Sequence, residues 1–263
     1  MSDFTRPLFT PLMAMLAATV TATAPAQAQQ RNFIALGAIS VPEFEGADDN
    51  AVAPFIIGRL DLGDAGALRI AGTGLQYNLI GGRSAWALGP LLSYRPKRDG
   101  SVDDPVLRTL REVDAAVEVG AFVEYGWRDA LAGGDRLALG LEGKGGKGAQ
   151  WALTASYMAP RLGGLQFSAD ARLGFANGRY MDSYFSIDAD NSARSGLPQY
   201  TATGGAKSGS VGFNLGYDLD GGWMLLGRVG YTRLLGDARD SPIVKLRDSA
   251  GSTSAGVAVG YRF

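Results

Sequence analysis

Residues 253–263 (TSAGVAVGYRF) alternate between two kinds of side chain up to the last residue of the chain. Side chains of an extended strand point to opposite faces with a period of two, so one face here is apolar and the other small or polar. At the edge of a soluble sandwich such a strand would promote pairing between molecules. In an outer-membrane barrel it closes the cylinder, with Tyr261 and Phe263 in an aromatic girdle. The segment favours the barrel, and we expect the outer-membrane assembly machinery to recognise the strand that ends in Phe263.

The first 28 residues have the pattern of an export signal. Arg6 supplies a short positive region, 7–20 is an apolar run, and 26–28 (AQA) is a cleavage site of the small-x-small type. The apolar run is too short to span a bilayer as a helix. We therefore expect a cleaved secretory signal peptide over 1–28 and a single barrel domain over 29–263, located in the outer membrane of a Gram-negative cell.

The composition is typical of an exported β-protein and excludes several kinds of catalytic and binding chemistry. The chain has 38 glycines among 263 residues, and 25 basic against 26 acidic residues give a net charge of −1. This balance argues against nucleic acid as a partner. The sequence contains no Cys and no His. Disulfides, thiolate chemistry and Ser-His-Asp hydrolysis are therefore excluded, and the commonest metal ligand is missing. We expect no catalytic residues, no cofactor and no metal site.

The two-residue period recurs along the mature chain, separated by turn residues, and a helical period does not fit it. Ten strands are predicted, at 32–42, 52–61, 84–95, 115–128, 135–144, 149–159, 163–175, 201–217, 222–234 and 253–263. The stretch 67–79 is predicted as an eleventh strand whose phase slips near 72–74. Segment 179–187 is either a twelfth strand or an extension of the strand before it. Because such barrels have an even number of strands, we predict an all-β, antiparallel transmembrane barrel of about 12 strands, with 10 as the alternative.

The polar faces of these strands are rich in Gly, Ala and Ser and carry isolated charges of both signs. A narrow lumen favours such small residues and compensated charges. The predicted lumen charges are Glu118, Glu124, Glu142, Asp170, Arg136, Arg172 and Arg228. They could line a pore or a proton relay, but a compensated network that fills the barrel is favoured. Val119, Leu139 and Leu215 are predicted to face lipid near mid-membrane, whereas Gly120 and Gly216 face the lumen.

Two polar segments are candidate binding sites. The acidic cluster Glu43, Glu45, Asp48 and Asp49 could hold a divalent cation, although a solvated loop near lipopolysaccharide is favoured. Segment 96–112 combines Lys97, Arg98, Arg108 and Arg111 with Asp99, Asp103 and Asp104, and Leu107 and Leu110 could anchor a partner. The predicted order of strands places it on the periplasmic side. The alternative is a mobile loop that contacts only water or lipopolysaccharide.

The spacing of the candidate residues gives little support for a catalytic function. Glu118 and Glu124 are six positions apart on one strand, or about 20 Å. Glycosidases need their two carboxyl groups within roughly 5–9.5 Å. The segment 194–198 (RSGLP) contains Gly and Pro and is read as a turn.

Six motifs in order resemble the MipA/OmpV family, named for an MltA-interacting protein, over essentially the whole mature chain. They are 42–49 (PEFEGADD), 74–79 (GLQYNL), 89–95 (GPLLSYR) followed by Arg98 and Asp99, 180–185 (YMDSYF), 192–198 (SARSGLP) and 234–244 (LLGDARDSPIV). The resemblance implies an outer-membrane β-barrel without catalytic residues. One branch of the family scaffolds a murein lytic transglycosylase to a bifunctional peptidoglycan synthase, and other branches are described as adhesins or osmolarity-responsive surface proteins.

Three functions therefore remain open. The first is a non-enzymatic scaffold that links the outer membrane to peptidoglycan-remodelling enzymes. The second is a small channel or a surface receptor or adhesin. The third is a lipid-modifying enzyme, which the absence of His disfavours. The expected surroundings are the lipid bilayer and lipopolysaccharide.

Overall fold

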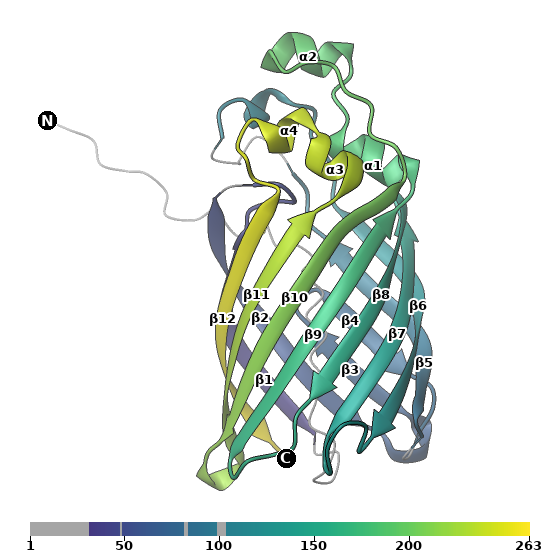
Figure 1. The fold of residues 1–263 in the computed structure, drawn as a ribbon, viewed down its shortest axis with the longest axis vertical. Coiled ribbons are helices and arrows are strands. Elements are labelled where there is room, and N and C mark those ends of the chain that lie inside the picture. The colour runs from purple at the N-terminus through teal and green to yellow at the C-terminus, as the bar shows by residue number, and fades with distance from the viewer. Residues whose placement is uncertain (1–31, 48, 82–83, 99–103) are drawn as a thin grey trace, which may run out of the picture.

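The chain forms a closed antiparallel barrel of twelve strands in a computed structural model that describes residues 32–47, 49–81, 84–98 and 104–263 (Figure 1). The strands are β1 (Phe33–Pro42), β2 (Asn50–Asp61), β3 (Ala67–Ala71), β4 (Gly74–Asn78), β5 (Trp86–Arg95), β6 (Ala116–Arg128), β7 (Arg136–Gly146), β8 (Gly148–Met158), β9 (Leu165–Ala176), β10 (Gly205–Asp218), β11 (Trp223–Leu234) and β12 (Gly251–Arg262). The all-β fold class and the count of twelve are confirmed. The predicted signal peptide, 1–28, falls outside the described ranges.

Consecutive strands pair with one another, and β12 pairs with β1 to close the barrel. The closing ladder runs from Phe33 opposite Arg262 to Ser40 opposite Ala255. Phe263 extends it by donating its backbone N–H to the carbonyl oxygen of Asn32 at 3.0 Å. Closure leaves no unpaired edge at the C-terminal strand, which is how an alternating strand of this kind avoids pairing with other molecules.

The outer face of the barrel is apolar, as predicted. Val119, Leu139 and Leu215 are all exposed on it. Their predicted depth is wrong for Leu139, which pairs with Tyr125. Tyr125 belongs to an edge-to-face aromatic cluster with Trp86 and Trp127 near one end of the barrel. Leu139 therefore lies close to an interface.

The predicted number of strands is correct, but two segments differ from their predicted structure. The stretch 67–79 is two strands, β3 and β4, because Gly72 adopts a positive φ of 55° and reverses the chain. The predicted strand at 179–187 is wrong, since Gly178–Phe185 forms helix α1. The side chain of Asn177 caps this helix by accepting a hydrogen bond from the backbone of Tyr180. Its apolar residues recur with a helical period that buries one face.

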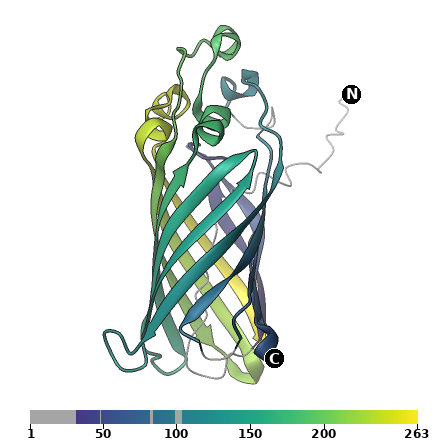
Figure 2. The same cartoon turned by 90° about the vertical axis from the view of Figure 1, so that its right-hand side faces the viewer.

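The two ends of the barrel differ. Strand β1 begins and β12 ends at one end, where the connections 62–66, 79–85, 129–135, 159–164 and 219–222 are short; we call it the turn end (Figure 2). Apart from the one-residue turn at Lys147 between β7 and β8, the opposite end carries longer connections, and we call 43–47, 104–115, 177–204 and 235–250 the cap. The cap contains α1, α2 (Ala189–Ser195), α3 (Gly236–Asp240), α4 (Pro242–Lys245) and the 3-10 turn Leu107–Thr109. A 3-10 turn also occurs at Gly63–Ala65 and at Asp220–Gly222.

Segment 96–112 belongs to the cap end, so its predicted periplasmic placement is wrong. The reason is the hairpin at 67–78, because one additional reversal of the chain moves the connections between it and the predicted strand at 179–187 to the opposite end. Among the helices that the structure describes, none combines the length and the hydropathy that a transmembrane helix requires.

Candidate functional site: a capped lumen and an open turn end

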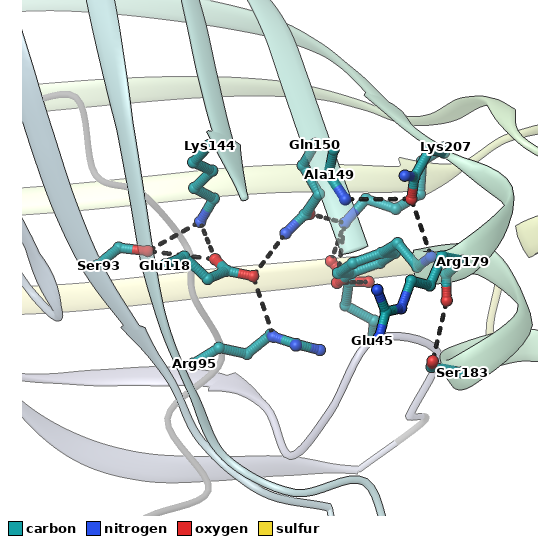
Figure 3. A network of polar contacts seen from close by, with 12 residues as sticks. Glu45, Ser93, Arg95, Glu118, Lys144, Ala149, Gln150, Arg179, Ser183 and Lys207 are labelled. Atoms are coloured by element: carbon teal, nitrogen blue, oxygen red, sulfur yellow. Dashed lines mark hydrogen bonds and ion pairs between the residues drawn. The ribbon is translucent and has the colours of Figure 1, made fainter. Parts of the chain in front are cut away.

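A buried polar network spans the lumen beneath the cap (Figure 3). Its centre is Glu118 on β6, whose side chain is 1% exposed. Lys144 of β7 and Arg95 of β5 approach the carboxylate at 2.8 and 3.1 Å. Ser93 and Gln150 donate to the same carboxylate at 3.3 and 3.1 Å. The inward positions of three neighbouring strands, β5, β7 and β8, therefore supply partners for a single buried negative charge.

The network continues from the barrel wall into the cap. Lys207 of β10 donates to the amide oxygen of Gln150 at 3.1 Å and forms an ion pair with Glu45 of the first loop. The Tyr180 hydroxyl of α1 donates to Glu45 at 3.0 Å. Burial alone would raise the pKa of Glu45, but the charge of Lys207 and the hydrogen bonds from Lys207 and Tyr180 lower it below its usual value. Glu45 therefore attaches the cap to the wall.

Two aromatic rings of α1 cover the end of the network. The guanidinium of Arg95 lies 4.7 Å from the ring centre of Tyr184 and 5.2 Å from that of Tyr180. Arg98 donates to the carbonyl oxygen of Tyr184 at 3.0 Å. Burial, only partly offset by the charge of Arg95, raises the pKa of Tyr184 to about 12. Burial, together with the neighbouring Glu45 carboxylate, also raises the pKa of Tyr180. Both phenols therefore stay neutral at physiological pH.

The remaining carboxylates predicted for the lumen are paired with cations. Arg228 donates to both oxygens of Asp170 at 2.6 and 2.9 Å. The other ion pairs are Glu142 with Arg172 at 2.6 Å and Glu124 with Arg136 at 2.7 Å. All seven predicted lumen charges thus take part in ion pairs, the arrangement expected of a compensated network that fills and stiffens a small barrel.

One contact in the network resembles a catalytic pair. Lys144 donates to the hydroxyl of Ser93 at 3.0 Å, and Ser-Lys pairs occur in hydrolases. In such enzymes a neutral lysine removes the proton of the serine. Here Lys144 is engaged in an ion pair with Glu118, and Ser93 is 2% exposed. The pair therefore has neither a free base nor access for a substrate.

The cap has an apolar core of its own. One cluster of buried side chains packs α1 against α3 and α4 and includes Met181, Phe185 and Val244. A second cluster brings together residues from the first loop, the 3-10 turn and α4: Phe44, Ala47, Leu107, Leu110, Ile187, Leu197 and Ile243. Ser241 donates to the carbonyl oxygen of Phe185 at 2.7 Å. The cap is thus a folded lid over the lumen.

The candidate acidic cluster is not assembled into a cation site. Glu45 turns into the lumen toward Lys207, whereas Asp49 is exposed and Asp48 belongs to the part of the chain that is not described. Within the described ranges no group of three or more carboxylates is placed to hold a metal ion. The favoured prediction of a solvated loop is therefore wrong for Glu45, because its carboxylate contacts Lys207 and Tyr180.

The described part of segment 96–112 packs into the cap. Leu107 and Leu110 are buried in its second apolar cluster, so they anchor the loop itself. The backbone N–H of Arg111 donates to the side chain of Asn191 at 2.8 Å. The predicted turn at 194–198 is the end of α2, where Gly196 adopts the left-handed conformation at φ 75°.

The turn end presents exposed leucines. Each of its five connections carries one: Leu62, Leu79, Leu131, Leu162 and Leu219. Leu131 is 75% exposed and Leu162 71%. Among the described residues of the cap, by contrast, Leu246 is the one exposed large apolar side chain, at 58%. The apolar surface at the two ends is therefore distributed unequally.

The turn that carries Leu131 is well ordered. The carboxylate of Asp135 accepts hydrogen bonds from the backbone N–H groups of Ala130, Leu131 and Ala132 at 2.6, 3.0 and 2.8 Å. The hydroxyl of Tyr157 donates to the same carboxylate at 3.1 Å. Desolvation would raise the pKa of Asp135, but these hydrogen bonds lower it below its usual value. Leu131 is thus held outward on a rigid turn.

Sequence reasoning missed the cap, although its signals are present. Asn177 and Asp188 each cap a helix that begins at the next residue, and Ser241 followed by Pro242 starts a third. Tyr180, Met181, Tyr184 and Phe185 have the i, i+1, i+4, i+5 spacing of a buried helical face.

A closed barrel with an apolar outer surface, aromatic clusters near its ends and a polar, charge-paired lumen defines an integral outer-membrane protein of the Gram-negative type. Within this class the chain belongs to the family described as MltA-interacting protein MipA, whose model matches residues 34–263. The expected family and the expected location in the outer membrane are thereby confirmed.

Solved structures of similar fold are distant in sequence. The NanC porin is 9% identical with a TM-score of 0.40, covering 87% of this chain and 100% of its own. The translocator domain of the autotransporter NalP from Neisseria meningitidis is 13% identical, with a TM-score of 0.42 and coverage of 89% and 88%. OmpT of Vibrio cholerae is 7% identical, with a TM-score of 0.38 and coverage of 88% and 96%. No curated protein matches the sequence. At these TM-scores the neighbours carry no argument about function.

Proposed function

We propose that this barrel is a non-enzymatic docking protein that holds a peptidoglycan-remodelling enzyme, a lytic transglycosylase and with it a peptidoglycan synthase, at the periplasmic face of the outer membrane. The observation that carries the proposal is the unequal distribution of exposed apolar side chains between the two ends. The family description, which refers to interaction with MltA, supports a partner of this class.

Orientation supports a docking site at the turn end. Outer-membrane barrels have short periplasmic turns and longer extracellular loops. The turn end, with its five short connections, therefore faces the periplasm, where peptidoglycan and its enzymes are found. Leu131 and Leu162 lie on two of these turns, the connections β6–β7 and β8–β9. Exposed apolar side chains on ordered turns are suited to fill pockets on a partner.

The alternative of a small channel has less support. Conduction would require a continuous aqueous path, and the apolar core of the cap lies across the outer end of the lumen. Glu45, Tyr180 and Lys207 tie that cap to the wall. We therefore expect purified protein in planar bilayers to show no steady conductance.

The docking proposal is tested by measuring the affinity of the folded barrel in nanodiscs for the purified lytic transglycosylase of the same cell. The double variant Leu131→Ser, Leu162→Ser should weaken binding about tenfold or more, since buried apolar anchors contribute at least about 1–2 kcal/mol each. Leu246→Ser, which changes an equally apolar residue of the cap, should bind as the unmodified protein does. Absence of binding by the unmodified barrel, or equal loss in both variants, would reject the proposal.

A further inference from the structure

The periplasmic mouth of the lumen contains a cavity of about 340 Å³ with an excess of arginine. Four arginines line it: Arg59, Arg69, Arg128 and Arg136. Among the described lining residues the one carboxylate is Asp61. A volume of this size is typical of a small-ligand site. The cavity is separate from the network beneath the cap.

The register of the strands places these arginines in two like-charged pairs. Arg59 of β2 is directly opposite Arg69 of β3, and Arg128 of β6 is directly opposite Arg136 of β7. Residues directly opposite on neighbouring strands have close Cβ atoms, and like charges at such positions destabilise the sheet. Two such pairs beside one cavity are unfavourable for the barrel alone, so they point to an anion that binds between them.

Two carboxylates lie close to three of the four guanidinium groups. Glu124 is shared between the two pairs, since it lies 2.7 Å from Arg136 and 3.6 Å from Arg69. Asp61 lies 3.7 Å from Arg59. The described lining of the cavity is thus rich in arginine, with four guanidinium groups and one carboxylate. Four arginines around one cavity favour a ligand with more than one negative charge.

We propose that this mouth is a binding site for a ligand that carries two or more carboxylates. The planar fork of arginine matches a carboxylate bidentately, and four forks around one cavity suit several carboxylates on a compact ligand. The ligand is either a small polycarboxylate or a run of acidic side chains from a periplasmic protein. This site does not depend on the docking of a transglycosylase at the turns.

Calorimetric titration of the full mature barrel in micelles distinguishes the two sources. Citrate represents the small polycarboxylate and an acetylated penta-glutamate peptide represents the acidic segment. Saturable binding of citrate supports a small ligand, and binding of the peptide alone supports a protein segment. Tighter binding of inorganic phosphate than of either would overturn the assignment to carboxylates, and absence of saturable binding by all of them would overturn the site.

Variants test which arginines are responsible. Arg59→Gln combined with Arg128→Gln removes one member of each pair and leaves both partners of Glu124 in place. We expect about tenfold or greater loss of affinity, because each lost hydrogen bond to a charged group has a large effect. Arg161→Gln at the same end, where Arg161 pairs with Asp218 outside the cavity, should bind normally. Equal affinity in the double variant would contradict the proposal.

A measurement on the unmodified protein covers the case in which the double variant does not fold. Phenylglyoxal modifies accessible arginines, and mass spectrometry reports each site. The bound ligand should protect Arg59, Arg69, Arg128 and Arg136 and leave modification of Arg161 unchanged. Protection of none of the four, or of Arg161 to the same extent, would overturn the site.

Discussion

Glu118 of β6 and Lys144 of β7 form an ion pair of 2.8 Å in which the two side chains are 1% and 9% exposed. Arg95 approaches the same carboxylate at 3.1 Å. Removal of one partner from a buried pair leaves an uncompensated charge, so the members of such a network stabilise the fold only together.

Glu118→Gln should therefore lower the free energy of unfolding by about 3–5 kcal/mol, since Arg95 and Lys144 lose their counter-charge inside the barrel. Urea unfolding in lipid vesicles measures this. Lys144→Met added to Glu118→Gln should restore part of the loss. Asp114→Asn, which breaks the exposed pair with Lys147, is the control and should have little effect. Equal losses in the buried and exposed variants would refute the account.

Arginine at Leu141 should destabilise the barrel more than arginine at Leu139. Leu141 pairs with Val123 and Leu153, away from the aromatic clusters, whereas Leu139 is opposite Tyr125 near the interface. A lipid-facing arginine costs about 2–4 kcal/mol at the midplane and about 0–1 kcal/mol near the interface. Unfolding titrations of both variants give the comparison. A cost for Leu139→Arg that equals or exceeds that of Leu141→Arg would mean that the depths are misassigned.

Gly120 and Gly143 lie on neighbouring strands but should respond differently to alanine. A Cβ at Gly120 would lie 1.9 Å from the carbonyl oxygen of Gly143, a backbone atom that cannot move alone. A Cβ at Gly143 meets nothing within 4 Å. We expect Gly120→Ala to destabilise by about 1–3 kcal/mol or to block folding. The heat-modifiable shift on gels reports folding, and normal behaviour of Gly120→Ala would contradict the wall packing.

Acid should loosen the cap through Glu45. Its folded-state pKa is lowered below 4.5, mainly because Lys207 and Tyr180 outweigh the effect of burial. A carboxyl group with a depressed pKa contributes stability above its unfolded pKa and loses it as pH falls through the folded value. Stability should therefore decline below about pH 4.5.

Glu45→Gln isolates this contribution. Its melting temperature should be lower than that of the unmodified protein near pH 7, and the difference should shrink toward about pH 3. Asp49→Asn, which changes an exposed residue of the same loop, is the control and should leave the melting temperature near pH 7 unchanged. A difference between Glu45→Gln and the unmodified protein that grows on acidification would show that the sign is wrong.

Alternation along single strands was sufficient to predict the barrel and its two faces. Val119 and Glu118 are adjacent in the sequence, and one faces lipid while the other is buried in the lumen. This period is a local property of extended chain, so each strand carries it without reference to its neighbours. The charges of the lumen could be predicted for the same reason, although their individual partners could not.

The connections between those strands, by contrast, were determined by the tertiary structure. The reversal at Gly72 splits 67–78 into two strands, and that one crossing determines which side of the membrane 96–112 occupies. The helices of the cap are stable because Met181, Phe185 and Val244 bury one another, which depends on contacts between distant loops. The arginine pairs at the mouth likewise arise from the register between strands, since Arg59 and Arg69 become neighbours only when β2 and β3 pair. Periodicity within a strand is encoded locally, whereas register and loop packing depend on the whole closed barrel.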